Sequence, residues 1–161
     1  MREASQEAVE KAERIIEQII YINIATVSAD GQPWNTPVYS AYDESYNFYW
    51  LSDQAGQHSQ NVKANGRVFL TIYDSTVPEG TGEGVFVKAM ASELSDPEEI
   101  KQALALLYSR KNQDPAKRRP DEFLGDYPRR VYKAVPEKIW INGHGDINGN
   151  YIDTRIEVIL I

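Results

Sequence analysis

Residues 46–74, YNFYWLSDQAGQHSQNVKANGRVFLTIYD, decide the fold because three structural signals follow one another within them. Tyr46–Leu51 is dense in aromatic and apolar side chains, which is typical of a strand. Gln57–Asn65 is short and polar and is followed by Gly66, a residue type that commonly ends helices. Val68–Tyr73 alternates between two faces, which predicts a second strand. The stretch therefore predicts a strand, a loop, a short helix and a returning strand.

Polar side chains gather where the first of these strands meets the helix. Ser52 closes the strand, and His58, Ser59 and Asn61 follow in the first turn of the helix. Backbone N–H groups at a helix start have no partner inside the helix and attract anions. One interpretation is therefore a phosphate pocket. The other is that Ser59 caps the helix and His58 is an ordinary surface histidine, and the spacing alone favours this second interpretation.

The order and spacing of these residues resemble the pyridoxamine 5'-phosphate oxidase-like family of FMN-binding split barrels. In that family a Ser or Thr ends the strand, and a Lys further along binds the FMN phosphate in the pattern Lys-x-x-Asn-Leu. The matching positions here are Ser52 and then His58-Ser59-Gln60-Asn61-Val62. The upstream hairpin also resembles the opening strands of the family and reads IATVSADGQPWNTPVYSAYD. The resemblance covers residues 22–94 well and residues 132–157 loosely.

Length and composition bound the class of protein. A chain of 161 residues predicts one domain with a substantial core, and its net charge of −7 argues against a nucleic-acid partner. Two short basic runs, Lys117-Arg118-Arg119 and Arg129-Arg130, are interpreted as a solvated loop or as contacts across a subunit interface. The chain has no cysteine, which excludes disulfides and thiolate metal sites.

The sequence shows no feature of a membrane or secreted protein. No apolar run approaches the length of a membrane span, and the charged N-terminus lacks the apolar core of a signal peptide. We therefore expect no membrane partner and a cytoplasmic location.

The rest of the chain predicts more strands and two further helices. Asp30-Gly31 marks a hairpin turn because this pair tolerates positive φ, and Asp96-Pro-Glu-Glu99 marks a helix start. Strands and helices do not alternate regularly, so an antiparallel barrel with helices at its ends fits better than a doubly wound sheet. The expected elements are a helix over Ser5–Ile20, strands over Tyr21–Ser28, Pro33–Tyr42 and Val85–Glu93, a helix ending near Asn112, one helical turn over Asp121–Gly125, strands over Arg130–Val135 and Lys138–Asn142 broken at Pro136, a turn-rich loop over Gly143–Gly149 and a final strand over Thr154–Ile161.

These elements predict a single, mainly β domain over residues 1–161, a split antiparallel β-barrel of the FMN-binding type. Its parts are an N-terminal helix at 1–20, core strands at 21–94, a helix at 96–112 and C-terminal strands at 130–161.

One glycine-rich segment has two open interpretations. Residues 75–84, STVPEGTGEG, hold three glycines and a proline, which forbid regular structure. No Gly-Lys-Ser/Thr follows, so the segment is not a P-loop. It is either a long hairpin connection or a binding loop, since connections of this length are often functional.

Hydrolase and metal chemistry have little support in the sequence. His58 and His144 are the only histidines, and no nucleophile-elbow signature is present. Asp146-Ile-Asn148-Gly-Asn150, followed by Asp153, carries its glycine too early for a calcium loop, so we expect no metal site there.

The family resemblance implies where a flavin would lie. A flavin needs an apolar or aromatic slot and a fixed site for its phosphate. The resemblance also implies a homodimer, in which the partner subunit completes the groove. The implied FMN-binding residues are Thr36, Pro37, Val38 and Tyr39 along the ring, Leu51, Ser52, His58, Ser59 and Asn61 near the phosphate, and Trp140 reaching the flavin from the partner subunit.

Some positions depart from the family pattern. The namesake oxidases carry an Arg and a Lys on the second strand, where this chain has Thr36 and Ala41, and an Arg-Lys pair at the helix start, where it has Gln57-His58. A histidine carries its full charge only below its pKa, about 6.5 when unperturbed. The sequence therefore favours a flavin-dependent oxidoreductase that transfers hydride to or from a small unidentified substrate over a pyridoxamine-phosphate oxidase.

Two alternative functions remain open on the same barrel. One is a non-catalytic flavin or haem binder, for which His144 would be the candidate axial ligand. The other is a deazaflavin-dependent reductase, although those relatives usually have a more basic phosphate region than His58 and Lys63 provide.

Overall fold

The computed structural model of the chain describes residues 5–160, without the side chains of Asp146 and Tyr151. The start of the expected N-terminal segment, residues 1–4, and the end of the expected final strand, Ile161, lie outside the described residues. The strands are β1 (Tyr21–Val27), β2 (Pro33–Tyr42), β3 (Phe48–Asp53), β4 (Arg67–Tyr73), β5 (Gly84–Glu93), β6 (Arg129–Ile147) and β7 (Asn150–Val158). The helices are α1 (Gln6–Gln18), α2 (Gln57–Ala64) and α3 (Pro97–Arg110), with two 3-10 turns, η1 (Pro115–Lys117) and η2 (Pro120–Phe123).

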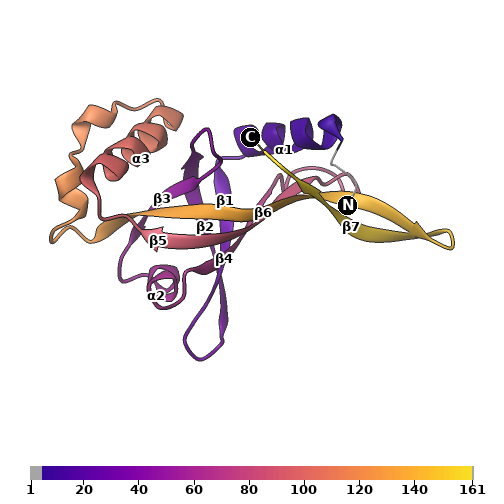
Figure 1. Cartoon of the computed structure of the whole chain (residues 1–161), viewed down its shortest axis with the longest axis horizontal. Coiled ribbons are helices and arrows are strands. Elements are labelled where there is room, and N and C mark those ends of the chain that lie inside the picture. Colours follow the sequence, from indigo (N-terminus) through magenta and orange to yellow (C-terminus); the bar gives the residue numbers. More distant parts are fainter. Residues whose placement is uncertain (1–4, 161) are drawn as a thin grey trace.

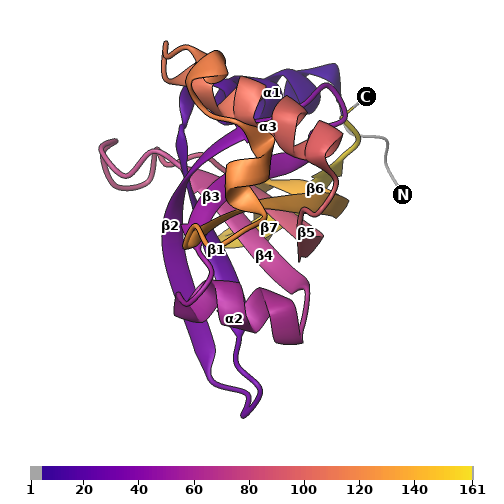
Figure 2. The ribbon, with the colours of Figure 1, turned by 90° about the vertical axis from the view of Figure 1, so that its left-hand side faces the viewer.

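The described strands form one antiparallel sheet that closes on itself. Their order is β3-β2-β1-β4-β5-β6-β7, and an additional pairing of β3 with β6 closes the first six of them into a barrel. Strand β7 pairs only with β6, and this hairpin projects beyond the barrel (Figure 1). Helices α1 and α3 lie toward one end of the barrel and α2 lies at the other (Figure 2). The predicted mainly β split barrel with flanking helices is confirmed.

Two apolar clusters hold these layers together. The barrel interior contains fully buried side chains such as Ile24, Leu70 and Trp50, and the Trp50 ring stacks on Tyr132 with centroids 5.6 Å apart. Helix α1 adds its buried stripe to this cluster, including Ile16. A second cluster joins one face of α3 to the outer side of the barrel and contains Tyr49, Ile100, Leu104, Leu107, Phe123 and Val131. Each cluster removes apolar surface from water, which is the main driving force for folding.

The expected break at Pro136 was wrong, because β6 continues through it. Ala89 of β5 pairs with Pro136 and Lys88 pairs with Lys138, so Glu137 is an extra residue in the ladder. Such a bulge lets a strand contain a proline, whose missing N–H would otherwise leave a gap in the ladder.

The expected loop at Gly143–Gly149 was also wrong, because most of it belongs to the β6–β7 hairpin. A Cβ atom on Gly143 would lie 2.8 Å from the side chain of Ile156, so glycine serves a close cross-strand contact there. The turn itself is Asn148-Gly149, with φ values of 55° and 80°, as a tight hairpin turn requires. Strand β7 therefore begins at Asn150, before the expected start at Thr154.

The start of β3 also differs from expectation. Tyr46 has a φ of 56° and lies in the preceding turn, so the strand begins at Phe48. The Tyr46 ring stacks on Tyr42 with centroids 5.6 Å apart, and its hydroxyl donates to Glu13 of α1. This tyrosine joins the turn to α1 instead of joining the sheet.

Replacing a barrel-core isoleucine tests this packing. Ile24 is completely buried, and the change Ile24→Ala should lower the free energy of unfolding by about 2–5 kcal/mol, since it leaves a cavity. The matched change Ile159→Ala removes the same atoms from a side chain that is 73% exposed and should cost less than about 0.5 kcal/mol. Urea denaturation of both variants measures the difference, and equal losses would contradict this description of the core.

Candidate functional site

The end of β3 and the start of α2 bring the predicted polar residues together. Strand β3 ends at Ser52-Asp53, and α2 begins after Gly56, its N-cap residue. Gly56 has no side chain to bond to the N–H groups of the first turn, which therefore need another partner. The interpretation of Ser59 as the cap was wrong, because Ser59 lies within the helix and is 2% exposed.

A cavity of about 330 Å³ lies beside this joint. This volume is at the lower end of the range for small-molecule sites. Seven of the ten predicted residues line it: Thr36, Pro37, Val38, Tyr39, Leu51, Ser52 and His58. Tyr21, Leu107, Lys111 and Arg129 complete the lining. Residues from strands β1, β2, β3 and β6, from α2 and from the end of α3 therefore meet in one place.

His58 and Ser52 form the polar centre of the cavity. His58 Nε2 lies 2.8 Å from Ser52 Oγ, within hydrogen-bond distance. Burial lowers the pKa of His58 below its usual value of 6.5, because a charged imidazole loses hydration there. At neutral pH the ring is therefore uncharged, and its contribution to the site is a hydrogen bond.

The positive charge of the cavity comes from two residues that sequence reasoning missed. Lys111 follows the last turn of α3, and its Nζ atom lies 4.7 Å from the centre of the Tyr39 ring. Arg129 begins β6. Burial lowers the pKa of Lys111, and the nearby charge of Arg129 lowers it further. No signal in the sequence places either cation near Ser52, because the contact depends on how the sheet closes.

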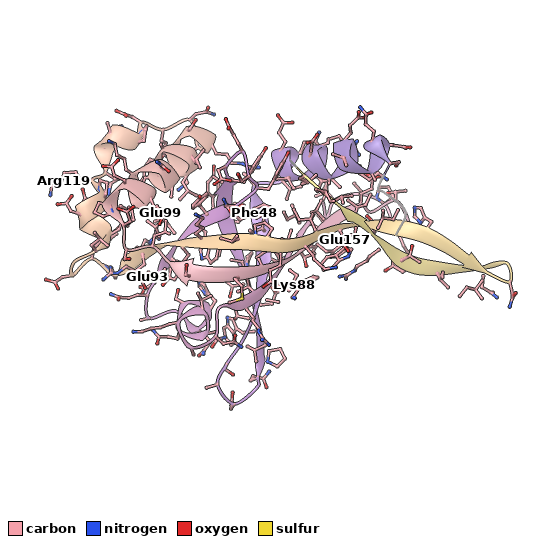
Figure 3. All side chains as sticks on the ribbon, viewed as in Figure 1. Phe48, Lys88, Glu93, Glu99, Arg119 and Glu157 are labelled. Carbon is pink, nitrogen blue, oxygen red and sulfur yellow. The ribbon has the colours of Figure 1, made fainter. Side chains whose placement is uncertain are left out.

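The interpretation of Arg129-Arg130 as a solvated loop was wrong for Arg130, whereas Arg129 is exposed; both residues belong to the start of β6. Arg130 is 7% exposed, donates to the backbone carbonyls of Gly125 and Tyr127, and forms an ion pair with Glu93 at 3.2 Å. Glu93 lies on the side of the barrel that carries α3 (Figure 3). Arg130 thus fixes the backbone from which Arg129 extends toward the cavity.

Asn61, one of the remaining predicted residues, has a structural contact instead of a place in the cavity. Its Nδ2 donates to Thr26 Oγ1 of β1 at 2.9 Å, and its Oδ1 accepts from Gln57 at 2.8 Å. These bonds hold α2 against the barrel. Asn61 also borders a separate hollow of about 590 Å³, between α2 and the β1–β2 turn.

Trp140 lies on the outer face of the barrel, away from the cavity of its own chain. Its ring stacks on Phe69 with centroids 6.3 Å apart, and Arg155 lies over Phe69 and Phe86. Trp140 pairs with Phe86 across β5 and β6, so the aromatic side chains form one continuous outer face. Such a partly exposed aromatic face is typical of an interaction surface.

His144 does not reach the cavity within its own chain. It lies in the projecting hairpin, fifteen residues along β6 from Arg129, which is about 50 Å of extended strand. Among the described side chains, no three His, Cys, Asp or Glu residues gather as a metal site would require. None of the described helices has the length and apolar character needed to cross a membrane.

Comparison with known families identifies this arrangement. The family model described as pyridoxamine 5'-phosphate oxidase matches residues 8–142. The matched region begins within α1, includes every element from β1 to η2, and ends within β6. A search of curated protein sequences finds no match to the chain.

Solved structures share the fold at low sequence identity. A protein of unknown function from Agrobacterium tumefaciens has a TM-score of 0.69 and 20% identity over 89% of this chain, which spans only 59% of that protein. The haem storage protein HutZ from Vibrio cholerae has a TM-score of 0.65 and 18% identity, covering 79% of this chain and 89% of its own. An FAD-binding protein from Mesorhizobium loti has a TM-score of 0.62 and 18% identity, covering 83% and 93%.

The protonation of His58 can be measured directly. Its pKa should lie below 6.5 in the folded protein, because burial disfavours the imidazolium. The unfolded chain then binds a proton more readily, so the free energy of unfolding should fall as pH drops below about 6.5 toward the folded-state pKa. An NMR titration of the imidazole C–H signals, assigned with a His58→Gln variant, gives the value. A pKa above 6.5 would mean that the ring is paired with an anion.

Proposed function

Because this chain belongs to the pyridoxamine 5'-phosphate oxidase-like family of split barrels, we propose that it binds FMN in the cavity beside Ser52 and His58. The observation that carries the proposal is the lining of that cavity. Residues chosen from the family pattern lie on three separate elements, β2, β3 and α2, yet they meet around one space. We further propose that the protein uses the flavin as an oxidoreductase acting on a small molecule.

The residues present fit a flavin phosphate at one end of the cavity and an apolar ring at the other. Val38, Leu51 and Leu107 supply apolar surface. Ser52, His58 and the uncapped start of α2 supply hydrogen bonds, and Lys111 and Arg129 supply positive charge. A volume of about 330 Å³ is small for a whole flavin, which supports a groove that a second subunit completes.

The chain's own residues position the ligand and exclude water. When bound, FMN would supply the hydride chemistry itself. His58 is neutral and bonded to Ser52, so its part is to orient a ligand group near the helix start. With the flavin supplying the hydride chemistry and the protein positioning the ligand, no side chain needs to act as a general acid or base.

The substrate we propose is not pyridoxamine phosphate. Of the two positions where the namesake oxidases carry strand-two cations, Ala41 is buried against the α3 cluster, and Thr36 is uncharged. Neither can neutralise a substrate phosphate. The two cations that line the cavity are too few to hold both a cofactor phosphate and a substrate phosphate firmly.

Flavin binding and its main alternatives are separated by the absorption spectrum of the purified protein. After FMN is added and the excess is removed, we expect the protein to show the absorption bands of bound flavin at nearly full occupancy. The fluorescence of the bound flavin should be quenched. A Soret band with added haemin and no response to FMN would favour a haem binder of the kind represented by the haem storage protein. Binding of a deazaflavin in preference to FMN would favour a reductase of the deazaflavin type.

Substitution of two buried serines, one in the cavity and one outside it, tests whether FMN binds at this site. Ser52→Ala removes the hydroxyl beside His58 and should weaken FMN binding by about tenfold, the effect of losing one hydrogen bond to a charged group. Ser40→Ala is the matched control, since Ser40 is 1% exposed on β2 and does not line the cavity. Fluorescence titration with FMN measures both, and equal affinities would argue against this cavity as the flavin site.

We also propose that two copies of the chain pair through the outer aromatic face. Phe69, Phe86 and Trp140 are partly exposed there, and β1 and β2 bring the cavity-lining residues Tyr21, Pro37 and Tyr39 to the same side of the sheet. A copy docked on this face would therefore cover the cavity as well. The proposal explains why a single chain offers only part of a flavin pocket.

The dimer is tested by placing a charge on that face. Trp140→Glu should convert a dimer to a monomer, raising the dissociation constant by tenfold or more, because it replaces an aromatic ring of the proposed interface with a charged carboxylate that would have to lose its hydration. Leu124→Glu is the control, at a side chain that is 39% exposed after η2. Light scattering after size-exclusion chromatography gives the masses. A wild-type monomer, or a Trp140 variant that remains dimeric, would contradict the proposed interface.

A further inference from the structure

The cavity carries two positive charges that no acidic side chain balances. The chain as a whole has a net charge of −7, yet the cavity lining contains Lys111 and Arg129 and neither Asp nor Glu. Among the described residues, neither cation has a carboxylate oxygen within ion-pair distance. Asp53 pairs with Arg129 across β3 and β6, but the two side chains form no ion pair.

Lys111 is held in place by aromatic rings. Its Nζ atom lies 4.7 Å from the centre of the Tyr39 ring and 5.3 Å from that of Tyr108. An ammonium group over the face of a ring is attracted by the negative charge of its π-system. The cation is therefore fixed over β2 beside the cavity, at the cost of part of its hydration.

The two cations that line the cavity also repel each other. The charge of Arg129 is one of the causes that lower the pKa of Lys111. Two like charges held near each other destabilise the protein unless an anion lies between them. A bound dianion would remove this repulsion and would accept hydrogen bonds from both side chains.

The start of α2 cannot supply the charge itself. Gln57 is directed away from the cavity, where it bonds to Asn61 and borders the separate hollow. His58 faces the cavity but is kept neutral by burial. At the helix start, where the family pattern has a lysine, α2 therefore contributes hydrogen-bonding groups and no positive charge.

We propose that Lys111 and Arg129 bind the terminal phosphate of the ligand, in place of cations on α2. The inference rests on the proposed function, since it takes the ligand to be FMN. Ser52, His58 and the first N–H groups of α2 complete the phosphate site from the opposite side. The charge is supplied by the end of α3 and the start of β6, two segments distant in sequence from α2.

The test compares FMN with riboflavin, which lacks the phosphate. Wild-type protein should bind FMN at least tenfold more tightly than riboflavin, since the phosphate would make charged hydrogen bonds to both cations. Lys111→Met and Arg129→Gln should each reduce FMN affinity by roughly tenfold and leave riboflavin affinity nearly unchanged. Added salt should weaken FMN binding and not riboflavin binding. Fluorescence titration of both flavins at two salt concentrations gives all of these values.

Two controls are matched to these variants by residue type. Lys117→Met and Arg119→Gln remove exposed cations between α3 and β6 that do not line the cavity, and Arg119 points outward from the barrel (Figure 3). The affinity for FMN should stay at the wild-type value in both. Arg129→Lys, which keeps the charge, should restore part of the affinity lost in Arg129→Gln.

The outcomes separate the two proposals. Tight FMN binding with an unchanged FMN-to-riboflavin ratio in both cavity variants would overturn the phosphate assignment and leave the flavin function standing. Equal affinity of the wild-type protein for FMN and riboflavin would also overturn the phosphate assignment and leave the flavin function standing, because the two cations would then not bind the phosphate. A comparable loss of FMN affinity in the two control variants would show a general effect of removing positive charge and would also overturn the phosphate assignment. No binding of either flavin would overturn both proposals.

Discussion

The pairing of β3 with β6 is the contact on which the barrel and its cavity both depend. Phe48–Asp53 pairs residue by residue with Ala134–Arg129, although the two segments are about eighty positions apart in the chain. This pairing closes the six strands β1–β6 into a barrel and covers the otherwise exposed edge of β3. It also places the end of β3, with Ser52, opposite the start of β6, with Arg130 and Arg129. Closure of the barrel and assembly of the candidate site are therefore the same structural event.

Helix α2 is positioned by buried polar bonds as much as by apolar packing. Asn61 bonds to Thr26 of β1, and both residues are almost fully buried. A buried amide without partners would be costly, so this bond fixes one orientation of the helix. With that orientation fixed, the first turn of α2 points His58 at Ser52. The short polar sequence of α2 is explained by this role, since the helix has only a narrow apolar side to bury.

Much of the fold could be predicted from the sequence because its signals are local. The strands around Asp30-Gly31 and the helix after Asp96 follow from turn and capping chemistry that acts within a few residues. The same holds for the strand–helix–strand order around His58. The residues of β2 and β3 that line the cavity were expected from the family resemblance and not from such local signals. Lys111 and Arg129 could not be predicted in this way, since they reach the cavity only through the packing of α3 and the closure of the sheet. Asn61 was chosen for its place in a motif, but its side chain has a bond that only the barrel's three-dimensional structure reveals.

The bulge at Glu137 explains how one strand can serve two different environments. Before it, the even-numbered residues Tyr132 and Ala134 face the barrel interior, and after it the odd-numbered Ile139 and Ile141 do so. The single additional residue thus reverses the inside–outside parity of the strand. Without it, Trp140 would point into the barrel and Ile141 would face water. The outward direction of Trp140, and with it the outer aromatic face, therefore depends on one glutamate that has no partner in the β5–β6 ladder.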